Sequence, residues 1–272
     1  MARSRRLPAP KRMRPDLEAR RAWDRAIGSW EDFQEAGKDF SRDQVHGPAL
    51  LRAIGRVDGL RVLDLGCGQG RFTRSLARRG AKVVAVDWSE KMIEAARRHE
   101  QEVPYGIEYL VADARTVGRS WRSGSFDMVV SCMALMDMPD LPRVLRRIRT
   151  LLKPGGRFVF STSHPLNTSA VRWEHRSGPD RGAMLIDRYF DERAEQLEWR
   201  MARLRRPFKT VFWHRTLETW FTELRRAGFD VERLSEPRAS PAQERRYSML
   251  RGSRKVPFFL VLSCRLRPAA EC

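Results

Sequence analysis

Apolar positions between residues 60 and 161 alternate regularly between two spacings. Short apolar runs predict strands at 61–65, 82–86, 107–111, 126–131 and 157–161. Apolar residues at helical spacing predict helices at 71–79, 89–98 and 140–152, the last closed by a Lys-Pro-Gly-Gly stop. Strands that alternate with helices favour a parallel sheet covered on both faces. The pattern therefore predicts an α/β domain.

Helical spacing continues on both sides of this core. Before it, residues 16–36 predict one helix, or two short ones because Gly28 and Ser29 interrupt the pattern, and 44–54 predicts another. After it, the pattern predicts a helix at 216–227, strands at 229–234 and 256–266, and a loop at 236–254.

Residues 164–210 break the alternation and are rich in Trp, Arg and Pro. Within them, 189–199 and 210–215 are expected to pair as antiparallel strands. Aromatic side chains here can close over a substrate with those of the first helix, or simply pack an added subdomain: Trp173, Tyr189, Phe190 and Trp199, with Trp23 and Trp30. The expected organisation is a basic arm at 1–15, covering helices at 16–56, and a core at 57–267 with a lid insertion at 165–213.

A glycine-rich segment follows the first core strand. It runs Asp64-Leu65-Gly66-Cys67-Gly68-Gln69-Gly70, and its glycines let a ligand approach the backbone beside a helix N-terminus. A dinucleotide fingerprint needs its third glycine one position later, where Arg71 stands. The Asp64 carboxylate can accept hydrogen bonds from a cationic amine. The segment therefore suits an amino acid–nucleoside ligand better than a pyrophosphate.

Two further carboxylates follow the next two strands. Asp87 ends the second strand, where an acidic side chain can accept hydrogen bonds from both hydroxyls of a ribose. Asp113 follows the third strand and can receive an exocyclic amine of adenine. Each has an ordinary alternative, because Asp is a common N-cap where a strand leads into a helix.

With these residues in place, the sequence resembles the class I S-adenosylmethionine-dependent methyltransferases. The likeness is to the small-molecule group related to ubiquinone and menaquinone methyltransferases, with a methyltransferase type 11 domain. It covers roughly residues 23–267 and rests on VLDLGCGQG, VVAVDWSEKMIEAAR, LVADA, FDMVVSCMALMDMPD and LLKPGGRFVFSTSHP. It implies a Rossmann-like, seven-stranded, mostly parallel sheet of order 3-2-1-4-5-7-6 with strand 7 antiparallel, helices on both faces and a small lid insertion.

The resemblance also implies a binding role for particular residues. It implies that the three glycines surround the methionine moiety of S-adenosyl-L-methionine. Asp87 would contact the ribose, and Asp113 with Ala114 would contact the adenine. Trp88 and Met92 would flank the adenine face, unless they only pack the start of a helix. The full expected cofactor set is Asp64, Gly66, Cys67, Gly68, Gly70, Asp87, Trp88, Met92, Asp113, Ala114 and Ser131.

Methyl transfer from a sulfonium is an in-line displacement, so alignment supplies much of the rate and a base is needed only for a protonated acceptor. Three residues are candidates for that base. Asp137 follows the fourth strand, His164 follows the fifth, and His214 lies on the expected lid. Their alternatives are a cap or ion pair for Asp137, a structural hydrogen bond for His164 and packing for His214.

The fourth strand ends in Ser131-Cys132-Met133-Ala134. The Asn/Asp-Pro-Pro-Tyr/Phe motif typical of amino-group methylation of bases and glutamine is absent there, which disfavours DNA or exocyclic RNA base methylation. Cys67 and Cys132 should end neighbouring strands, and we interpret them as buried apolar thiols rather than nucleophiles. The four cysteines show no paired spacing, which favours a cytoplasmic protein, and no metal site is expected. No apolar run approaches the ~18 residues of a membrane span.

The net charge of the 272 residues is +19, from 53 Lys and Arg against 34 Asp and Glu. Such a balance raises nucleic acid as a partner, but 46 of the 53 basic residues are Arg, as a GC-rich coding bias would also produce. The leading hypothesis is methyl transfer (EC 2.1.1.-) to a small-molecule acceptor at O, N or C, by a monomer or homodimer. The alternatives are an RNA or rRNA methyltransferase using the basic arm, and a non-catalytic regulator that keeps cofactor binding.

Overall fold

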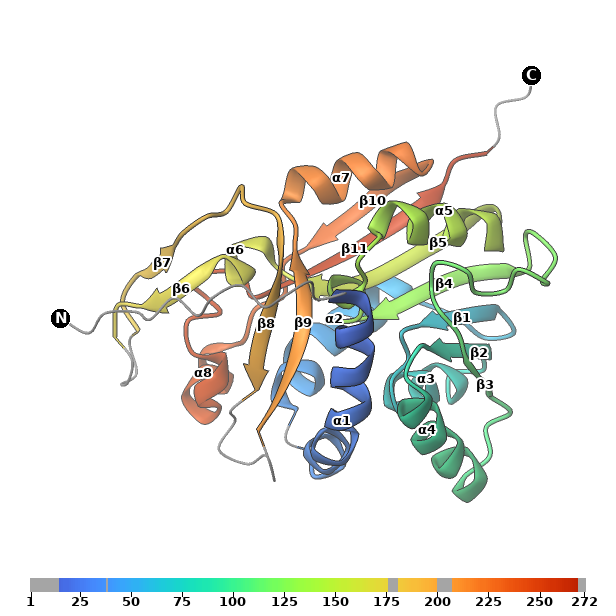
Figure 1. Cartoon of the computed structure of the whole chain (residues 1–272), viewed down its shortest axis with the longest axis horizontal. Coiled ribbons are helices and arrows are strands. Elements are labelled where there is room, and N and C mark those ends of the chain that lie inside the picture. The colour runs from blue at the N-terminus through green and yellow to red at the C-terminus, as the bar shows by residue number, and fades with distance from the viewer. Residues whose placement is uncertain (1–14, 38, 176–180, 200–206, 269–272) are drawn as a thin grey trace.

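The structure is a computed structural model that describes residues 15–37, 39–175, 181–199 and 207–268. The basic arm expected at 1–15 therefore lies almost wholly outside the described residues. The centre of the structure is a seven-stranded sheet, which Figure 1 shows in the order β10-β11-β5-β4-β1-β2-β3. These strands are β1 (Arg61–Leu65), β2 (Lys82–Asp87), β3 (Glu108–Val111), β4 (Phe126–Cys132), β5 (Leu152–Ser163), β10 (Phe229–Ser235) and β11 (Phe259–Leu266).

The sheet has the topology that the family resemblance implies. The strands β1 to β5 pair in parallel, and β11 runs antiparallel to both β5 and β10. Apart from its first residue, β1 is buried, as expected for a strand covered on both faces. The predicted order 3-2-1-4-5-7-6 is therefore confirmed, with β10 as strand 6 and β11 as strand 7.

Helices cover both faces of the sheet (Figure 1). On one face, α5 (Leu141–Leu151) and α7 (Leu217–Arg226) pack Val144, Leu145 and Trp220 onto the strands. On the other face the apolar layer comes from α2 (Gly47–Ile54), α3 (Arg71–Ala77) and α4 (Glu90–Glu102). Among the described residues, no helix combines the length and the apolar character needed to cross a bilayer.

The chain before the sheet forms one long helix rather than two. Helix α1 (Pro15–Glu35) continues through Gly28, which is exposed and has no atom within 4 Å of an added Cβ. The buried stripe of Ala19, Ala22, Ala26 and Phe33 offsets the cost of about 1 kcal/mol of a glycine within a helix. A short π-helix, η1 (Arg42–His46), then leads directly into α2.

The insertion after β5 forms two small antiparallel sheets. Short helix α6 (Pro165–Thr168) precedes the pair β6 (Ala170–Trp173) and β7 (Met184–Ile186), which the sequence did not indicate. The predicted pairing of 189–199 with 210–215 is present as β8 (Arg193–Trp199) and β9 (Phe208–His214). The stretch expected as a loop at 236–254 holds helix α8 (Pro241–Arg246) and a 3-10 turn, η3 (Ser248–Leu250).

Candidate active site

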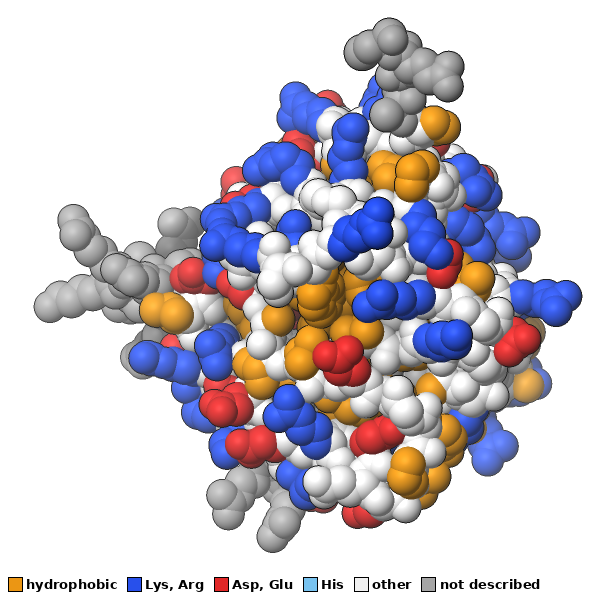
Figure 2. Space-filling model, turned by 90° about the vertical axis from the view of Figure 1, so that its right-hand side faces the viewer, with side chains coloured by type: hydrophobic (Ala, Val, Ile, Leu, Met, Phe, Trp, Pro, Cys, Tyr) orange, Lys and Arg blue, Asp and Glu red, His pale blue; other side chains and the backbone are white. Residues whose placement is uncertain are grey.

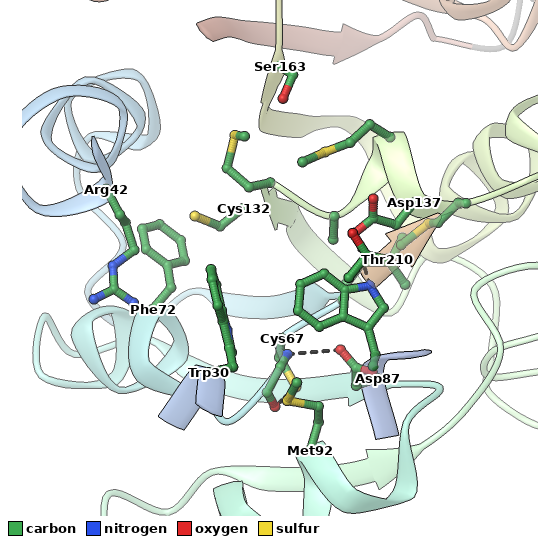
Figure 3. A pocket seen from close by; sticks show the side chains of 18 of the residues that line it. Trp30, Arg42, Cys67, Phe72, Asp87, Met92, Cys132, Asp137, Ser163 and Thr210 are labelled. Carbon is green, nitrogen blue, oxygen red and sulfur yellow. Dashed lines mark hydrogen bonds between the residues drawn. The ribbon is translucent and has the colours of Figure 1, made fainter. Parts of the chain in front are cut away.

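A cavity of about 510 Å³ opens at the carboxyl ends of β1, β2 and β4. In Figure 3, Cys67, Asp87 and Met92 lie at one end and Cys132, Asp137 and Ser163 at the other, with the ring of Trp30 between them. Open α/β sheets bind their ligands at this edge. We call the first end the glycine-loop end and the second the far end.

The loop after β1 turns tightly enough to leave its backbone facing the cavity. Gly66 and Gly68 line the cavity with φ of 76° and 56°, values that glycine adopts without strain. A Cβ on Gly66 would lie 2.4 Å from Cβ of Ala134, whereas one on Gly68 would meet no atom within 4 Å. Gly66 therefore permits close packing against the segment after β4, and Gly68 keeps the backbone open to a ligand.

Two buried carboxyls flank this loop. Asp64 accepts a hydrogen bond of 2.6 Å from Oγ1 of Thr73, and its Oδ1 has no hydrogen-bond partner among the described residues. Asp87 accepts bonds of 2.9 Å from the backbone N–H groups of Gly68 and Ser89. Burial raises the pKa of Asp64 to about 7 and that of Asp87 to about 6. Both groups suit a ligand that brings hydrogen-bond donors or positive charge.

The remaining predicted residues of the glycine-loop end also line the cavity, namely Cys67, Trp88, Met92, Asp113 and Ala114. Asp113 is engaged by a neighbour, since its carboxylate lies 2.6 Å from a guanidinium nitrogen of Arg115. Burial opposes its ionisation, but the hydrogen bonds and charge of Arg115 outweigh burial and lower its pKa. Its role at an adenine remains a prediction.

Asp137 is the one predicted base candidate that lines the cavity. It ends a 3-10 turn after β4, η2 (Leu135–Asp137), and lies on the cavity wall in Figure 3. Its carboxylate accepts a bond of 3.2 Å from Nε1 of Trp23 on α1. Burial raises its pKa well above the usual range, which favours the protonated carboxyl. In this state Asp137 is a hydrogen-bond donor rather than a base.

The two histidine candidates face other partners. His164 caps α6, with Nδ1 accepting a bond of 3.2 Å from the Leu166 N–H and Nε2 lying 3.0 Å from Glu236. His214 is held between Oγ1 of Thr168 at 2.6 Å and the carbonyl of Tyr189 at 2.7 Å. Neither is among the described residues that line the cavity. The structure thus gives both rings structural partners, and their role as a base stays a prediction.

Two residues of the expected cofactor set also lie off the cavity wall. Gly70 caps α3 with φ of 80°, and a Cβ there would lie 2.4 Å from the hydroxyl of Tyr109. The hydroxyl of Ser131 donates a bond of 2.8 Å to the Leu65 carbonyl and so ties β4 to β1. Both residues support the loop from behind, and their contact with a cofactor stays a prediction.

Cys67 and Cys132 both line the cavity, at opposite ends of it (Figure 3). Both are free thiols. Burial raises the pKa of Cys132 to about 12 and raises that of Cys67 as well. Because the thiolate is the nucleophile, thiols in this state are poor nucleophiles. The part of the chain that the structure describes also contains no cluster of three metal-ligating side chains.

Aromatic rings from α1 and the β8–β9 hairpin wall off the far end. Trp30 lies 5.4 Å from Trp199 and 6.2 Å from Phe208, measured between ring centroids. Trp173 also lines the cavity, whereas Tyr189 packs against His214 and Phe190 is 85% exposed. Of the aromatic residues expected in a lid, the structure thus brings Trp23, Trp30, Trp173 and Trp199 to the cavity.

Sequence reasoning missed several polar and sulfur-bearing residues of the far end. They are Asp39, Arg42, His46, Met133, Met136, Ser163 and Thr210. Most of these residues come from segments in which we found no sequence motif. The π-helix η1 does not follow the spacing of an α-helix, so the pattern of apolar residues does not reveal which of its side chains face the cavity. Met133 has φ of 54°, an unusual value for a residue with a side chain, directly after β4.

Comparison with known proteins matches this geometry to one family. A family model described as "Methyltransferase domain" matches residues 63–160. An S-adenosylmethionine-dependent methyltransferase structure from Mesorhizobium loti is 35% identical, with a TM-score of 0.66, over 80% of this chain and 96% of that one. An uncharacterised protein of Haemophilus influenzae is 29% identical over 202 residues, 71% of this chain and 76% of that one.

Matches to named enzymes are shorter. A ubiquinone biosynthesis O-methyltransferase of Xanthomonas axonopodis pv. citri is 39% identical over 105 residues, 38% of this chain and 43% of that enzyme. This chain therefore spans less than half the length of that relative. Together with the sheet order and the glycine loop, the comparisons show that the chain belongs to the class I S-adenosylmethionine-dependent methyltransferases. The cofactor of this enzyme family is S-adenosyl-L-methionine, and the buried carboxyls suit its ammonium and hydroxyl groups.

The raised pKa values of Asp64 and Asp87 predict that cofactor binding depends on pH. Both carboxyls gain protons as the pH falls from about 8 to about 5, and a protonated Asp64 loses its attraction for an ammonium group. Calorimetry with S-adenosylhomocysteine should therefore show an affinity about tenfold weaker near pH 5.5 than near pH 7.5. The unliganded protein should behave oppositely. Because the folded pKa lies above the unfolded value, its free energy of unfolding should fall as the pH rises from about 4 to about 7.

The control for this prediction is Asp64→Asn, which removes the carboxyl with the higher pKa of the two. Its affinity should change less with pH than that of the wild-type protein, with the remaining dependence centred near 6. A wild-type affinity that is constant across this range contradicts the assignment of these carboxyls to the cofactor.

Proposed function

We propose that the protein transfers the methyl group of S-adenosyl-L-methionine to a small-molecule acceptor by in-line displacement. The observation that carries this proposal is the continuous cavity, whose glycine-loop end has the predicted cofactor residues and whose far end is walled by aromatic and methionine side chains. Pockets that enclose small molecules have such mainly apolar walls with few polar groups.

At the glycine-loop end, we propose that Asp87 binds the ribose hydroxyls and that Asp64 faces the ammonium group. When bound there, the cofactor supplies an activated methyl group on a sulfonium. The chain's own contribution is to orient the cofactor and the acceptor. Binding the two in line converts a bimolecular reaction into an effectively unimolecular one. Burial favours the protonated form of Asp137, and in that form the carboxyl, held by Trp23, can donate a hydrogen bond to an acceptor placed between the two ends.

Helix α1 is attached to the core by polar contacts close to the cavity. Asp24 accepts a bond of 2.6 Å from the hydroxyl of Ser89, and Trp23 donates to Asp137. Glu31 lies 3.1 Å from Nε2 of His99 on α4. These contacts hold the aromatic face of α1 over the cavity. Such a cover excludes water and supports a small acceptor over a polymer.

The distribution of basic side chains gives only weak support to a small-molecule acceptor over nucleic acid. On the face seen in Figure 2, Lys and Arg side chains are scattered over the whole surface with acidic side chains among them, around a central apolar area. A nucleic-acid site would be expected to gather them into a stripe or patch. The basic arm lies outside the described residues, so RNA is retained as an outcome of the experiment below.

The similarity to the Xanthomonas ubiquinone biosynthesis O-methyltransferase supports an acceptor of low molecular mass. The family model that matches this chain covers residues 63–160 and so leaves out α1 and the β8–β9 hairpin. Those two elements wall off the far end of the cavity. We therefore expect the residues of the far end to determine which acceptor binds. The attacking atom, O, N or C, follows from the identity of that acceptor.

The test is incubation of the full chain with methyl-labelled cofactor and cell extract, with and without nuclease treatment. We expect the label in the small-molecule fraction, unchanged by nuclease. Label that is found in RNA and released by nuclease supports the RNA methyltransferase instead. Absence of label from every fraction, with cofactor binding intact, supports a non-catalytic regulator.

A further inference from the structure

The π-helix η1 turns two side chains of one short segment into the cavity. Its wide turn ends where the Gly47 N–H bonds back to the Arg42 carbonyl. A Cβ on Gly47 would lie 2.4 Å from that carbonyl oxygen, so the turn depends on glycine at this place. Both Arg42 and His46 line the cavity as a result. π-Turns of this kind occur frequently at functional sites.

His46 is a buried polar group whose bonding capacity is incompletely used. The residue is 4% exposed, and its Nδ1 has no hydrogen-bond partner among the described residues. An unsatisfied buried polar atom destabilises a protein, because the atom has lost its hydrogen bonds to water without replacement. A ligand that bonds to Nδ1 would remove this cost, and His46 lies in the wall of the cavity where such a ligand would be.

The surroundings of His46 are apolar and aromatic. Its ring lies 4.8 Å from that of Phe259, and Phe258, Met133 and Met249 line the same cavity. Phe258, Phe259 and Met133 belong to one apolar cluster beneath η1. Flat apolar molecules fit such walls of rings and thioethers.

The charges around His46 are balanced before any ligand arrives. Arg42 lies 3.0 Å from Asp43 and 3.9 Å from Asp39, and Asp43 also pairs with Arg71 at 3.2 Å. Burial, and then the charge of Arg42, lower the pKa of His46 to about 3, so its imidazole is neutral. A neutral imidazole has one donor and one acceptor nitrogen.

We propose that His46 binds a hydroxyl group of a planar, largely apolar acceptor through Nδ1. This inference rests on the proposed function and adds the chemical class of the acceptor. A hydroxyl suits either tautomer because it both donates and accepts. An ammonium group would be repelled by Arg42, and a carboxylate would find that guanidinium already paired. His46 acts here as a binding group that orients the acceptor.

The experiment compares two probes that differ by one hydroxyl, 2-naphthol and naphthalene, added to the full chain saturated with S-adenosylhomocysteine. Quenching of tryptophan fluorescence reports binding, since Trp23, Trp30 and Trp199 line the cavity. We expect the wild-type protein to prefer 2-naphthol about tenfold, the equivalent of one good hydrogen bond. His46→Leu should lose this preference, and His46→Asn, whose amide can replace Nδ1, should retain most of it.

His175→Leu is the matched control, because His175 is exposed and is not among the described residues that line the cavity. It should leave the preference unchanged. Unchanged affinity for S-adenosylhomocysteine shows that each variant is folded. A second readout is the imidazole nitrogen resonance that His46→Asn lacks, which should shift with 2-naphthol and stay unprotonated to about pH 4.

The inference is overturned if His46→Leu keeps the preference, or if the wild-type protein binds neither probe. These outcomes are separable from failure of the proposed function. Probe binding requires no methyl transfer, whereas the proposed function fails when labelled methyl groups do not reach small molecules.

Discussion

Asp87→Ala is expected to weaken binding of S-adenosylhomocysteine about 100-fold and to abolish detectable methyl transfer. Asp87 accepts hydrogen bonds from Gly68 and Ser89 at the cavity, and in the proposed complex it also accepts bonds from the ribose hydroxyls. Each hydrogen bond to a charged group is worth about 1.5–3 kcal/mol, and two of them account for the loss. Isothermal titration calorimetry measures it.

Asp127→Ala is the matched control for this variant. Asp127 lies near the amino end of β4, away from the carboxyl ends of the strands where the cavity opens. There it accepts a bond of 2.9 Å from the Arg61 N–H. Its loss should leave the affinity for S-adenosylhomocysteine unchanged. If Asp87→Ala binds as tightly as this control, then the ribose is bound elsewhere.

Gly66→Ala is expected to destabilise the protein by about 3 kcal/mol or more and to remove cofactor binding. Two costs add at this position. The backbone has φ of 76°, which costs a residue with a side chain about 1–2 kcal/mol. The new Cβ would also lie 2.4 Å from Ala134, in a closely packed segment. Urea denaturation monitored by fluorescence gives the change in the free energy of unfolding.

Gly59→Ala separates these two costs. Gly59 has φ of 73°, almost that of Gly66, but an added Cβ there meets no atom within 4 Å. It should therefore lose only about 1 kcal/mol and bind S-adenosylhomocysteine normally. Equal losses of stability in the two variants would show that the contact with Ala134 is unimportant.

The glycine-loop half of the site was predictable because its residues directly follow predicted strands in the sequence. Gly66, Gly68 and Asp87 each follow an apolar run, and the carboxyl ends of parallel strands meet at one edge of the sheet. The sheet order, in contrast, was available only through the family resemblance. The position of Gly70 in the sequence does not show that it lies off the cavity wall and packs against Tyr109.

The far half was less predictable because it is built from tertiary contacts. His164 was expected beside the acceptor, but β5 continues to Ser163 and the ring is used as the cap of α6. His46 was missed, since its direction depends on a π-turn that a helical pattern does not reveal. Helix α8 was readable in principle, because Ser240 and Gln243 form a capping box around a proline.

The central claim is that one enclosed cavity brings the cofactor and a small acceptor together. The most direct test is mass spectrometry of a metabolite extract incubated with trideuteromethyl-labelled cofactor and either the wild-type protein or Asp87→Ala. The account predicts a small molecule heavier by one trideuteromethyl group with the wild-type protein and its absence with the variant. Label that appears only in RNA or protein, with none in the small-molecule fraction, would contradict it.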